Sequence, residues 1–410
     1  MNPDPASAIR SPLEAARAMR DREGMAFLDS AMAGAGSISI LACEPDLVVR
    51  GRDWEALEAE LKTRSCGSAG EGLPEGAAIG WVAYDGEFCF SFHERLHVFV
   101  HGEERWIRPP EDFKPAAVSG EPLRIGFRPK VGRERFLEMV NRAQEWIAAG
   151  DIYQVCLSHP FEAAASGRAW DFHEELRRCS PAPYAAYLDA GDTQIVSASP
   201  ESFLEMTGRL IRTRPIKGTR PRLADPRSDQ KSSRELMSSE KEIAELVMIT
   251  DLERNDLGQV CEYGSVKVPG LLELEAFEQV FHLVSTVEGR MREEISHVAA
   301  LRACFPGGSI SGAPKKRAME IIAELEPFPR GIYTGAIGYF GFHGGSHFSM
   351  AIRTAVFERE RTHFHVGAGI VADSEAESEW RETWHKAAGL LMAADSGELR
   401  GDRAGGADVD

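Results

Sequence analysis

A lysine inside a dense run of basic side chains is the first feature of this sequence that could do chemistry. The run contains Arg212, Arg214, Lys217, Arg220 and Arg222, and Pro215, Gly218 and Pro221 predict that it forms a loop. Gly218, directly after Lys217, permits close approach of the backbone to a ligand. A lysine that is desolvated in such a site loses its proton and acts as a nucleophile or base. The alternative is a solvated basic loop paired with surface acids.

Two pairs of glutamates repeat one helical spacing. Glu242 and Glu245 are three residues apart in one predicted helix, and Glu379 and Glu382 are three apart in another. Four carboxylates on two helix faces are suited to a hard cation such as Mg²⁺. The alternative is that these glutamates are ordinary solvent-exposed residues of helix surfaces. Lys386, one turn after Glu382, is equally explained as the partner of Glu382 in an i, i+4 surface ion pair.

An arginine and a glycine run mark a second candidate anion site. Arg353 is expected on a strand, in phase with Ala351 and Ala355, where it either binds a carboxylate bidentately or reaches water from a sheet edge. The Gly367-Ala368-Gly369 run would let backbone N–H groups approach an anion, although glycines in strands also mark bulges.

Glu201 ends a strand-like run sixteen residues before Lys217, so we expect the two on adjacent strands. It is then a candidate proton donor, and the alternative is an exposed turn glutamate. The segment 307–315 leads into a helix whose N-terminus would attract anions, but it lacks the spacing of a phosphate-binding loop.

The elements that must position these residues predict an α+β fold. Residues 332–342, 346–357 and 362–371 form three successive strand-like runs, typical of an antiparallel meander. Helices are expected at 133–149, 238–256, 314–324 and 377–392. Without a regular β-α-β repeat, we expect largely antiparallel sheets packed together and covered by helices.

Composition restricts the partners. The 410 residues are 43% hydrophobic and 27% charged, with a net charge of −17, which is globular composition with a surface that repels nucleic acid and anionic lipid. Seven cysteines without any C-x-x-C pair favour a reducing cytosol. Because the chain shows neither a signal peptide nor an apolar run of spanning length, we expect a cytoplasmic protein.

We expect a domain boundary at the proline-rich connection 104–123. We expect disorder at 1–12 and 396–410, an N-terminal region at 13–123 and a catalytic region at 124–395.

Several of these motifs together resemble the chorismate-utilising enzyme family. The matching segments are Pro215–Thr219, Asp251–Gly258, Ser311–Lys315, Gly367–Ser374 and Glu379–Thr383. The resemblance covers roughly residues 124–395 and is loose before them. It implies that family's fold and activity on chorismate.

Two positions separate the branches of that family. Lysine at position 217 is typical of aminodeoxychorismate synthase component I, whereas anthranilate synthase component I usually has alanine there. Gln154 resembles the glutamine of members that use ammonia, in place of the lysine base of members that use water. The resemblance therefore implies amination.

The resemblance also implies roles for the candidate residues. Mg²⁺ bound by Glu245 and Glu382, with Glu242 and Glu379 in support, would hold the ring carboxylate of chorismate. Arg353 and Tyr333 would bind the enolpyruvyl carboxylate. Other implied substrate-lining residues are Gly218, Thr219, His282, Gly367, Ala368, Gly369, Lys386 and Gln154.

The implied reaction uses Lys217 as a nucleophile. Neutral Lys217 would attack C2 and expel the C4 hydroxyl with a proton from Glu201, and ammonia would then add at C4 and eject the lysine. The product, 4-amino-4-deoxychorismate, would need a separate lyase to give 4-aminobenzoate for folate synthesis.

No cysteine lies in a glutaminase-type G-x-C-x-G segment, so the ammonia would come from a separate glutamine amidotransferase subunit. The rival expectations are anthranilate synthase component I and a non-catalytic, chorismate-binding regulatory subunit.

Overall fold

The computed structural model describes residues 11–32, 37–65, 72–110, 122–277 and 280–395. The predicted disorder at 1–12 and 396–410 lies outside these residues, except that Ser11 caps a helix that begins at Pro12. The predicted connection at 104–123 is also largely outside them. In the described ranges no helix is long and apolar enough to cross a membrane.

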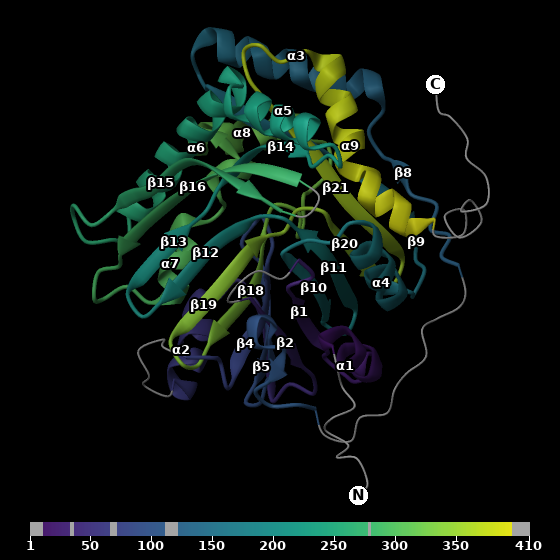
Figure 1. Ribbon diagram of the computed structural model, residues 1–410, viewed down its shortest axis with the longest axis vertical. Helices are drawn as coiled ribbons and strands as arrows, with labels where there is room; N and C mark the ends of the chain where they lie inside the picture. Colours follow the sequence, from purple (N-terminus) through teal and green to yellow (C-terminus); the bar gives the residue numbers. More distant parts are fainter. Residues whose placement is uncertain (1–10, 33–36, 66–71, 111–121, 278–279, 396–410) are drawn as a thin grey trace, which may run out of the picture.

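Two large antiparallel sheets form the centre of the molecule (Figure 1). Among the described residues the first sheet has eleven strands, with β8 (Arg128–Pro129) pairing to β9 beside the main path. The order of its other strands is β17 (Gly312–Ala313), β9 (Gln154–Ala164), β21 (Arg361–Ile370), β20 (Thr354–Glu358), β11 (Thr193–Ser199), β10 (Tyr184–Asp189), β1 (Ala26–Asp29), β2 (Ile38–Ala42), β6 (His97–Val100) and β7 (Arg105–Trp106).

The second sheet has ten strands in the same described ranges, with β15 (Lys267–Ala276) pairing to β16 beside the path. The order of the others is β14 (Ile216–Pro221), β16 (Val280–Arg290), β13 (Leu210–Thr213), β12 (Ser202–Thr207), β19 (Gly345–Met350), β18 (Ala336–Gly341), β4 (Ala77–Val82), β5 (Phe88–His93) and β3 (Leu47–Gly51). Strands of both predicted regions pair directly, as β4 does with β18 and β1 with β10, so the domain limits remain a prediction.

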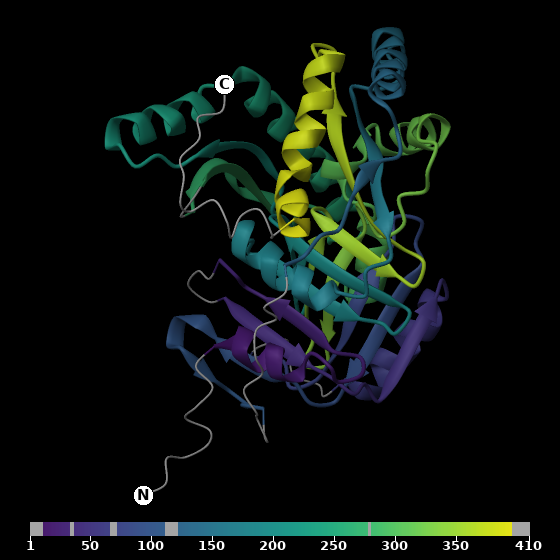
Figure 2. The same cartoon turned by 90° about the vertical axis from the view of Figure 1, so that its right-hand side faces the viewer.

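Helices cover the outer faces of both sheets, as the two views show (Figures 1 and 2). They are α1 (Pro12–Met19), α2 (Trp54–Arg64), α3 (Arg133–Ala149), α4 (Ala169–Cys179), α5 (Pro226–Met237), α6 (Glu240–Gly258), α7 (His297–Cys304), α8 (Lys315–Leu325) and α9 (Ala376–Ala394). Short 3-10 turns add η2 (His101–Glu103) and η3 (Gly308–Ile310).

The hydrophobic core has layers that follow this arrangement. Ile40 and Ile195 of the first sheet pack with Ile79 and Ile337 of the second, in one buried cluster between the sheets. On the outer face of the first sheet α4 and α9 bury a second cluster, and α7 packs with α2 against the second sheet. The expected α+β class, with packed antiparallel sheets under helices, is confirmed.

The predicted C-terminal meander is wrong in one respect. The run 346–357 is two strands, β19 and β20, which belong to different sheets. The chain breaks its pairing at 351–353, where Arg353 has a φ of 51°. Arg353 is therefore in a connection between the sheets and not in strand phase with Ala351 and Ala355, and Tyr333 likewise lies in a turn before β18.

Candidate active site

Lys217 lies on β14 at a bulge created by a glycine. The pairing of β14 with β16 slips directly after Lys217, and Gly218 has a φ of 76°. A Cβ on Gly218 would lie 2.6 Å from Leu236 Cδ1 and 3.1 Å from Glu242 Oε2, so only glycine leaves room for α5 and α6 here. With α6 packed this closely against β14, Lys217 Nζ lies 3.7 Å from Glu245 Oε2.

The predicted glutamates face the same region from α6 and α9, and each has a basic partner. The pairs are Arg220–Glu242 at 3.7 Å, Lys217–Glu245 at 3.7 Å, Lys241–Glu379 at 4.0 Å and Lys386–Glu382 at 2.6 Å. Ser239 caps α6 through the N–H of Glu242, which fixes the turn that carries the first pair. The two predicted pairs are therefore brought to one site.

Burial and mutual repulsion disfavour ionisation of two of these carboxyls. Burial raises the pKa of Glu245 and of Glu379, and the charge of Glu382 adds to both effects. Burial acts on Glu382 too, but the ammonium groups of Lys386, Lys217 and Lys241 together outweigh it and hold the pKa of Glu382 below its ordinary value. The four carboxylates are thus matched by four basic side chains, and a hard cation would have to displace some of these partners to reach them.

The four glutamate side chains are not arranged as the ligands of a bound metal ion. Within the described ranges no group of three or more Asp, Glu, His or Cys side chains is arranged to hold a metal ion. The carboxylate oxygens are of the type that Mg²⁺ prefers, and turning them from their lysine partners would free them to coordinate it. Their role as magnesium ligands remains a prediction.

The expected neutral form of Lys217 is not the one that its surroundings favour. Burial alone would lower the pKa of Lys217, but Cys156, Glu245, Glu201 and Glu382 outweigh burial and raise the pKa above its ordinary value. The ammonium form is therefore stabilised by the very carboxylates that were predicted to bind the cation. A positive charge added at the glutamates would act in the opposite direction.

Glu201 lies between β11 and β12 and is buried, with only 7% of its surface exposed. The expectation that it and Lys217 occupy adjacent strands is wrong, because β16 and β13 separate β14 from β12. The two nevertheless interact across the site, since Lys217 counteracts the effect of burial, which raises the pKa of Glu201. A buried carboxyl whose pKa is raised holds a proton more readily than an exposed one, which suits it to proton donation.

Arg353 and Tyr333 lie on two connections that are bonded to each other. Thr334 N donates to Ala351 O at 2.8 Å, and Ala351 N donates to Gly335 O at 2.9 Å. Arg353 has no carboxylate within ion-pair distance among the described residues, and burial lowers the pKa of its guanidinium. An arginine in that condition is suited to bind an anionic ligand.

His282 and Thr219 line the same side of the site from paired positions on β16 and β14. Thr219 Oγ1 lies 2.9 Å from His282 Nδ1. Burial lowers the pKa of His282, and the positive charge of Arg353 lowers it further. His282 is therefore a neutral hydrogen-bonding group beside Arg353.

The glycine run on β21 opens the floor of the site. A Cβ on Gly369 would lie 2.6 Å from Gln154 Nε2 and 3.8 Å from Lys217 Nζ, and one on Gly367 would lie 3.0 Å from the Tyr333 hydroxyl. Ala368 between them points its side chain into the core. The two glycines therefore bring three predicted side chains against bare backbone, while Lys386 Nζ donates to Gly367 O at 2.9 Å.

Three arginines of the basic run form ion pairs with acidic side chains, as the alternative of a paired basic segment predicts. Arg212 pairs with Glu288 at 3.4 Å, Arg222 pairs with Asp229 at 3.0 Å, and Arg214 pairs with Glu275. The run is also not a loop, because it forms β13 and β14. Lys217 and Arg220, which pairs with Glu242 at 3.7 Å, are the members of the run that face the candidate site.

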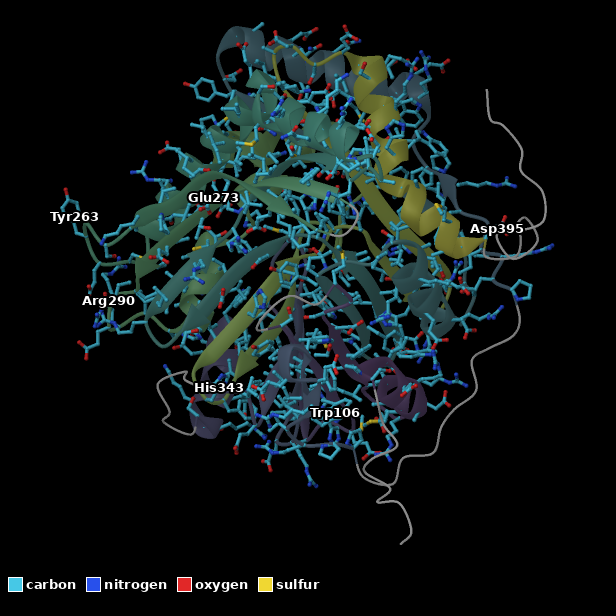
Figure 3. The ribbon with its side chains drawn as sticks, viewed as in Figure 1. Trp106, Tyr263, Glu273, Arg290, His343 and Asp395 are labelled. Atoms are coloured by element: carbon cyan, nitrogen blue, oxygen red, sulfur yellow. The ribbon has the colours of Figure 1, made fainter. Side chains whose placement is uncertain are left out.

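A cavity of about 880 Å³ opens between the sheets, and its lining includes neither Lys217 nor the four glutamates. Its lining includes Asp29 of β1, Arg214 and Tyr184. Glu273 on β15 and His343 in the turn between β18 and β19, both labelled in Figure 3, also line it. Its size alone does not identify the place of the chemistry, which the carboxylates and Lys217 indicate better.

Three groups near the site escaped prediction. Cys156, whose thiol pKa is raised by burial, lies near Lys217, and Glu253 Oε1 accepts from Gly308 N at 2.9 Å beside the site. Arg330 and its partner Glu326 are buried behind Tyr333. Their residue types and spacing carry no chemical signature, so only tertiary structure reveals them.

Comparisons with known proteins identify the family of the chain. A family model described as chorismate binding enzyme matches residues 81–392. Anthranilate synthase component 1 of Streptomyces coelicolor is 47% identical over 289 residues, which are 68% of this chain and 57% of that protein. Aminodeoxychorismate synthase component 1 of Salmonella typhimurium is 45% identical over 277 residues, which are 67% and 61%. The chain thus spans about three fifths of the length of these relatives.

Solved structures extend the likeness to almost the whole chain. Anthranilate synthase component I from Streptococcus pneumoniae superposes with a TM-score of 0.75 at 32% identity, covering 87% of this chain and 93% of that one. The menaquinone-specific isochorismate synthase of Escherichia coli shares the fold, with a TM-score of 0.77 at 18% identity over 94% and 92%. The chain therefore belongs to the chorismate-binding enzyme family.

Proposed function

We propose that this protein is the aminating component of an aminodeoxychorismate synthase, which converts chorismate and ammonia to 4-amino-4-deoxychorismate. The observation that carries the proposal is the position of Lys217, with Nζ 3.7 Å from Glu245 and directed at the bare backbone of Gly369. A lysine in that place supplies a nucleophile that an alanine cannot. Gln154 beside it supports ammonia as the second nucleophile, as the family resemblance implies.

In the first step the Lys217 amine forms a bond to C2 of the ring. The ring double bonds shift, the C4–O bond breaks, and the departing hydroxyl takes the proton of Glu201 and leaves as water. The buried Glu201, whose pKa burial raises, holds that proton until it is needed.

In the second step ammonia adds at C4. The double bonds shift back, the C2–N bond breaks, and Lys217 leaves as an amine. The new C4 ammonium returns one proton to Glu201, so the net reaction consumes chorismate and ammonia and releases water. Both side chains finish in their starting forms.

The two carboxylates of chorismate would lie at opposite ends of the site. Arg353, which has no acidic partner within ion-pair distance in the described residues, would take the enolpyruvyl carboxylate together with the Tyr333 hydroxyl. Glu242, Glu245, Glu379 and Glu382 would hold Mg²⁺ at the other end. When bound there, Mg²⁺ supplies positive charge that positions the ring carboxylate and offsets the carboxylates that keep Lys217 protonated.

Ammonia would come from a separate glutamine amidotransferase. The relatives named component 1 support this, and the cysteines of the described ranges are all free thiols in no glutaminase-type segment. The product would pass to a separate lyase that forms 4-aminobenzoate for folate synthesis.

Anthranilate synthase is the second candidate, because relatives of that name are as similar as those named aminodeoxychorismate synthase. The purified protein with chorismate, Mg²⁺ and an ammonium salt distinguishes them by product mass and fluorescence. We expect 4-amino-4-deoxychorismate and no anthranilate. Fluorescent anthranilate, formed without any lyase, would overturn the proposal.

A further inference from the structure

A buried ion pair lies behind Tyr333. The side chains of Arg330 and Glu326 are 2% and 5% exposed. Arg330 Nε donates to Glu326 Oε2 at 2.9 Å, and its Nη2 donates to Oε1 at 2.7 Å. A bidentate pair removed from water is costly to maintain unless its other donors and acceptors are also satisfied.

The remaining hydrogen bonds of the pair reach two segments that border the site. Arg330 Nη2 donates to Cys156 O on β9 at 2.7 Å, and its Nη1 donates to Ile310 O at 3.1 Å. Glu326 Oε1 accepts from Ser158 N at 2.7 Å and from Ser158 Oγ at 3.0 Å. The pair therefore fixes the part of β9 that lies opposite the glycine run of β21, where Gly367 is in register with Ser158.

The pair also holds a strained turn. Thr334 has a φ of 60°, a conformation that is costly for a β-branched residue and persists only where its neighbours impose it. Arg330 Nη1 donates to Thr334 Oγ1 at 3.2 Å, and this hydroxyl donates to Tyr333 O at 2.5 Å. Tyr333 N in turn donates to Arg330 O at 3.1 Å.

These bonds set the direction of the Tyr333 ring. The guanidinium carbon of Arg330 lies 5.9 Å from the ring centre, and His365 stacks on the ring at 5.4 Å. The Tyr333 hydroxyl then meets the open backbone of Gly367, 3.0 Å from where a Cβ would be. The ring is thus held by partners that are themselves buried.

We propose that the Glu326–Arg330 ion pair is a positioning element for Tyr333, and that it sets the affinity of the site for the second carboxylate of the substrate. Neither residue touches the substrate; both act through the strained turn at Thr334. The inference rests on the proposed function only in placing Tyr333 against chorismate, and it holds for either product.

A double-mutant cycle tests the proposal by steady-state consumption of chorismate with Mg²⁺ and an ammonium salt. Glu326→Gln keeps the shape and an acceptor for Ser158 but removes the charge that orients Arg330. We expect its KM for chorismate to rise about tenfold with kcat within about threefold, the signature of lost ground-state binding. In a Tyr333→Phe background the same change should raise KM no further, because its effect passes through the Tyr333 hydroxyl.

Glu324→Gln, an exposed change of the same kind on α8, is the matched control and should leave KM and kcat unchanged. Fully additive effects of Glu326→Gln and Tyr333→Phe on KM would overturn the proposal, as would a fall in kcat at constant KM. Chorismate consumption is measured whichever product forms, so anthranilate as product would contradict the proposed function without touching this inference.

Thr334→Gly is a second variant that tests the same proposal if Glu326→Gln does not fold. Glycine accepts the positive φ without strain, so the fold should persist while the hydroxyl that links Arg330 to Tyr333 is lost. We expect KM to rise about threefold at an unchanged melting temperature. A KM equal to that of the parent protein in this folded variant would overturn the positioning role.

Discussion

The two ends of the candidate site differ in how their charges are balanced. At the glutamate end, four carboxylates on α6 and α9 are paired with three lysines and an arginine at 2.6–4.0 Å, and the exposure of the four glutamate side chains runs from 4% for Glu379 to 44% for Glu382. At the Tyr333 end, one bidentate pair is almost fully buried and each partner has further hydrogen bonds. Three of the four pairs at the first end are longer than 3.5 Å, which suits a site whose cations are to be exchanged, whereas the second end is held in place by short hydrogen bonds before any ligand arrives.

This difference indicates which end is suited to bind a metal ion and which is suited to orient a substrate carboxylate. A metal site must be able to release the lysines that occupy its carboxylates, so partial exposure and loose pairing suit it. A carboxylate-orienting site gains from rigidity, because less ordering remains to be done when the substrate binds. The changes below test the two ends from the largest expected effect to the smallest.

Removing the lysine at the junction of the two ends should have the largest effect. We expect Lys217→Ala to lower aminodeoxychorismate formation about 10³-fold, because Lys217 supplies the amine that lies beside Gly369 and would attack C2. Chorismate should still bind with Mg²⁺, as titration calorimetry can measure. Lys231→Ala, an exposed lysine on α5, is the control. Turnover of Lys217→Ala equal to that of this control would eliminate the covalent step.

Neutralising one carboxylate of the glutamate end should have the next largest effect. Glu245→Gln leaves the backbone of α6 unchanged but removes a predicted magnesium ligand, so we expect half-saturation by Mg²⁺ to require about ten- to a hundredfold more metal. Mg²⁺ titration of activity measures this. Glu240→Gln, exposed at the start of the same helix, should match the parent protein. An unchanged titration for Glu245→Gln would mean that the exchangeable end binds no metal.

The sequence predicted these two ends unequally. The glutamate end was accessible because helical spacing places Glu242 with Glu245 and Glu379 with Glu382 whatever their surroundings. The helix predicted at 133–149 likewise matches α3, since its apolar residues follow one face and Gly150 ends it in the left-handed region. Local rules suffice for such elements.

The structure at the Tyr333 end could not be predicted from local sequence rules of this kind. The segment 346–357 gives no sign that it changes sheets at 351–353, because both of its strands are almost completely buried and their burial does not alternate. The left-handed conformations of Thr334 and Arg353 are imposed by tertiary hydrogen bonds, which no neighbouring residue in the sequence encodes. The same is true of Lys217 and Glu201, which interact across strands that are not adjacent.

A methyl group added at Gly369, between the two ends of the site, tests how much space the structure leaves around Gln154 and Lys217. A Cβ on Gly369 would lie 2.6 Å from Gln154 Nε2, so Gly369→Ala must displace that side chain and crowd Lys217. We expect kcat/KM to fall about tenfold, with little change in melting temperature, because the displaced atom ends a flexible side chain. A kcat/KM within twofold of the parent value would show that the nucleophile has more room than the structure indicates.

A third charged cluster combines features of both ends and should give the smallest effect. Glu253 is 2% exposed, and it shares with Asp256 a single buried cation, Lys315, which lies 2.5 Å from Asp256 Oδ2. Burial, reinforced by the charge of Asp256, raises the pKa of Glu253, and one of its oxygens has no hydrogen-bond partner in the described residues. The cluster is buried like the Tyr333 end but unbalanced like the glutamate end.

The sign of the resulting pH dependence follows from the raised pKa. The folded protein holds a proton on Glu253 that the unfolded chain releases near pH 4.5, so this group stabilises the fold at low pH and loses that contribution as pH rises through the folded pKa. Glu253→Gln keeps the acceptor for Gly308 N but cannot ionise. Relative to the parent, its free energy of unfolding should therefore improve by about 1–2 kcal/mol between pH 6 and pH 9. Urea titrations at both pH values measure this, and a constant difference between the two proteins would show that Glu253 is already ionised at pH 6.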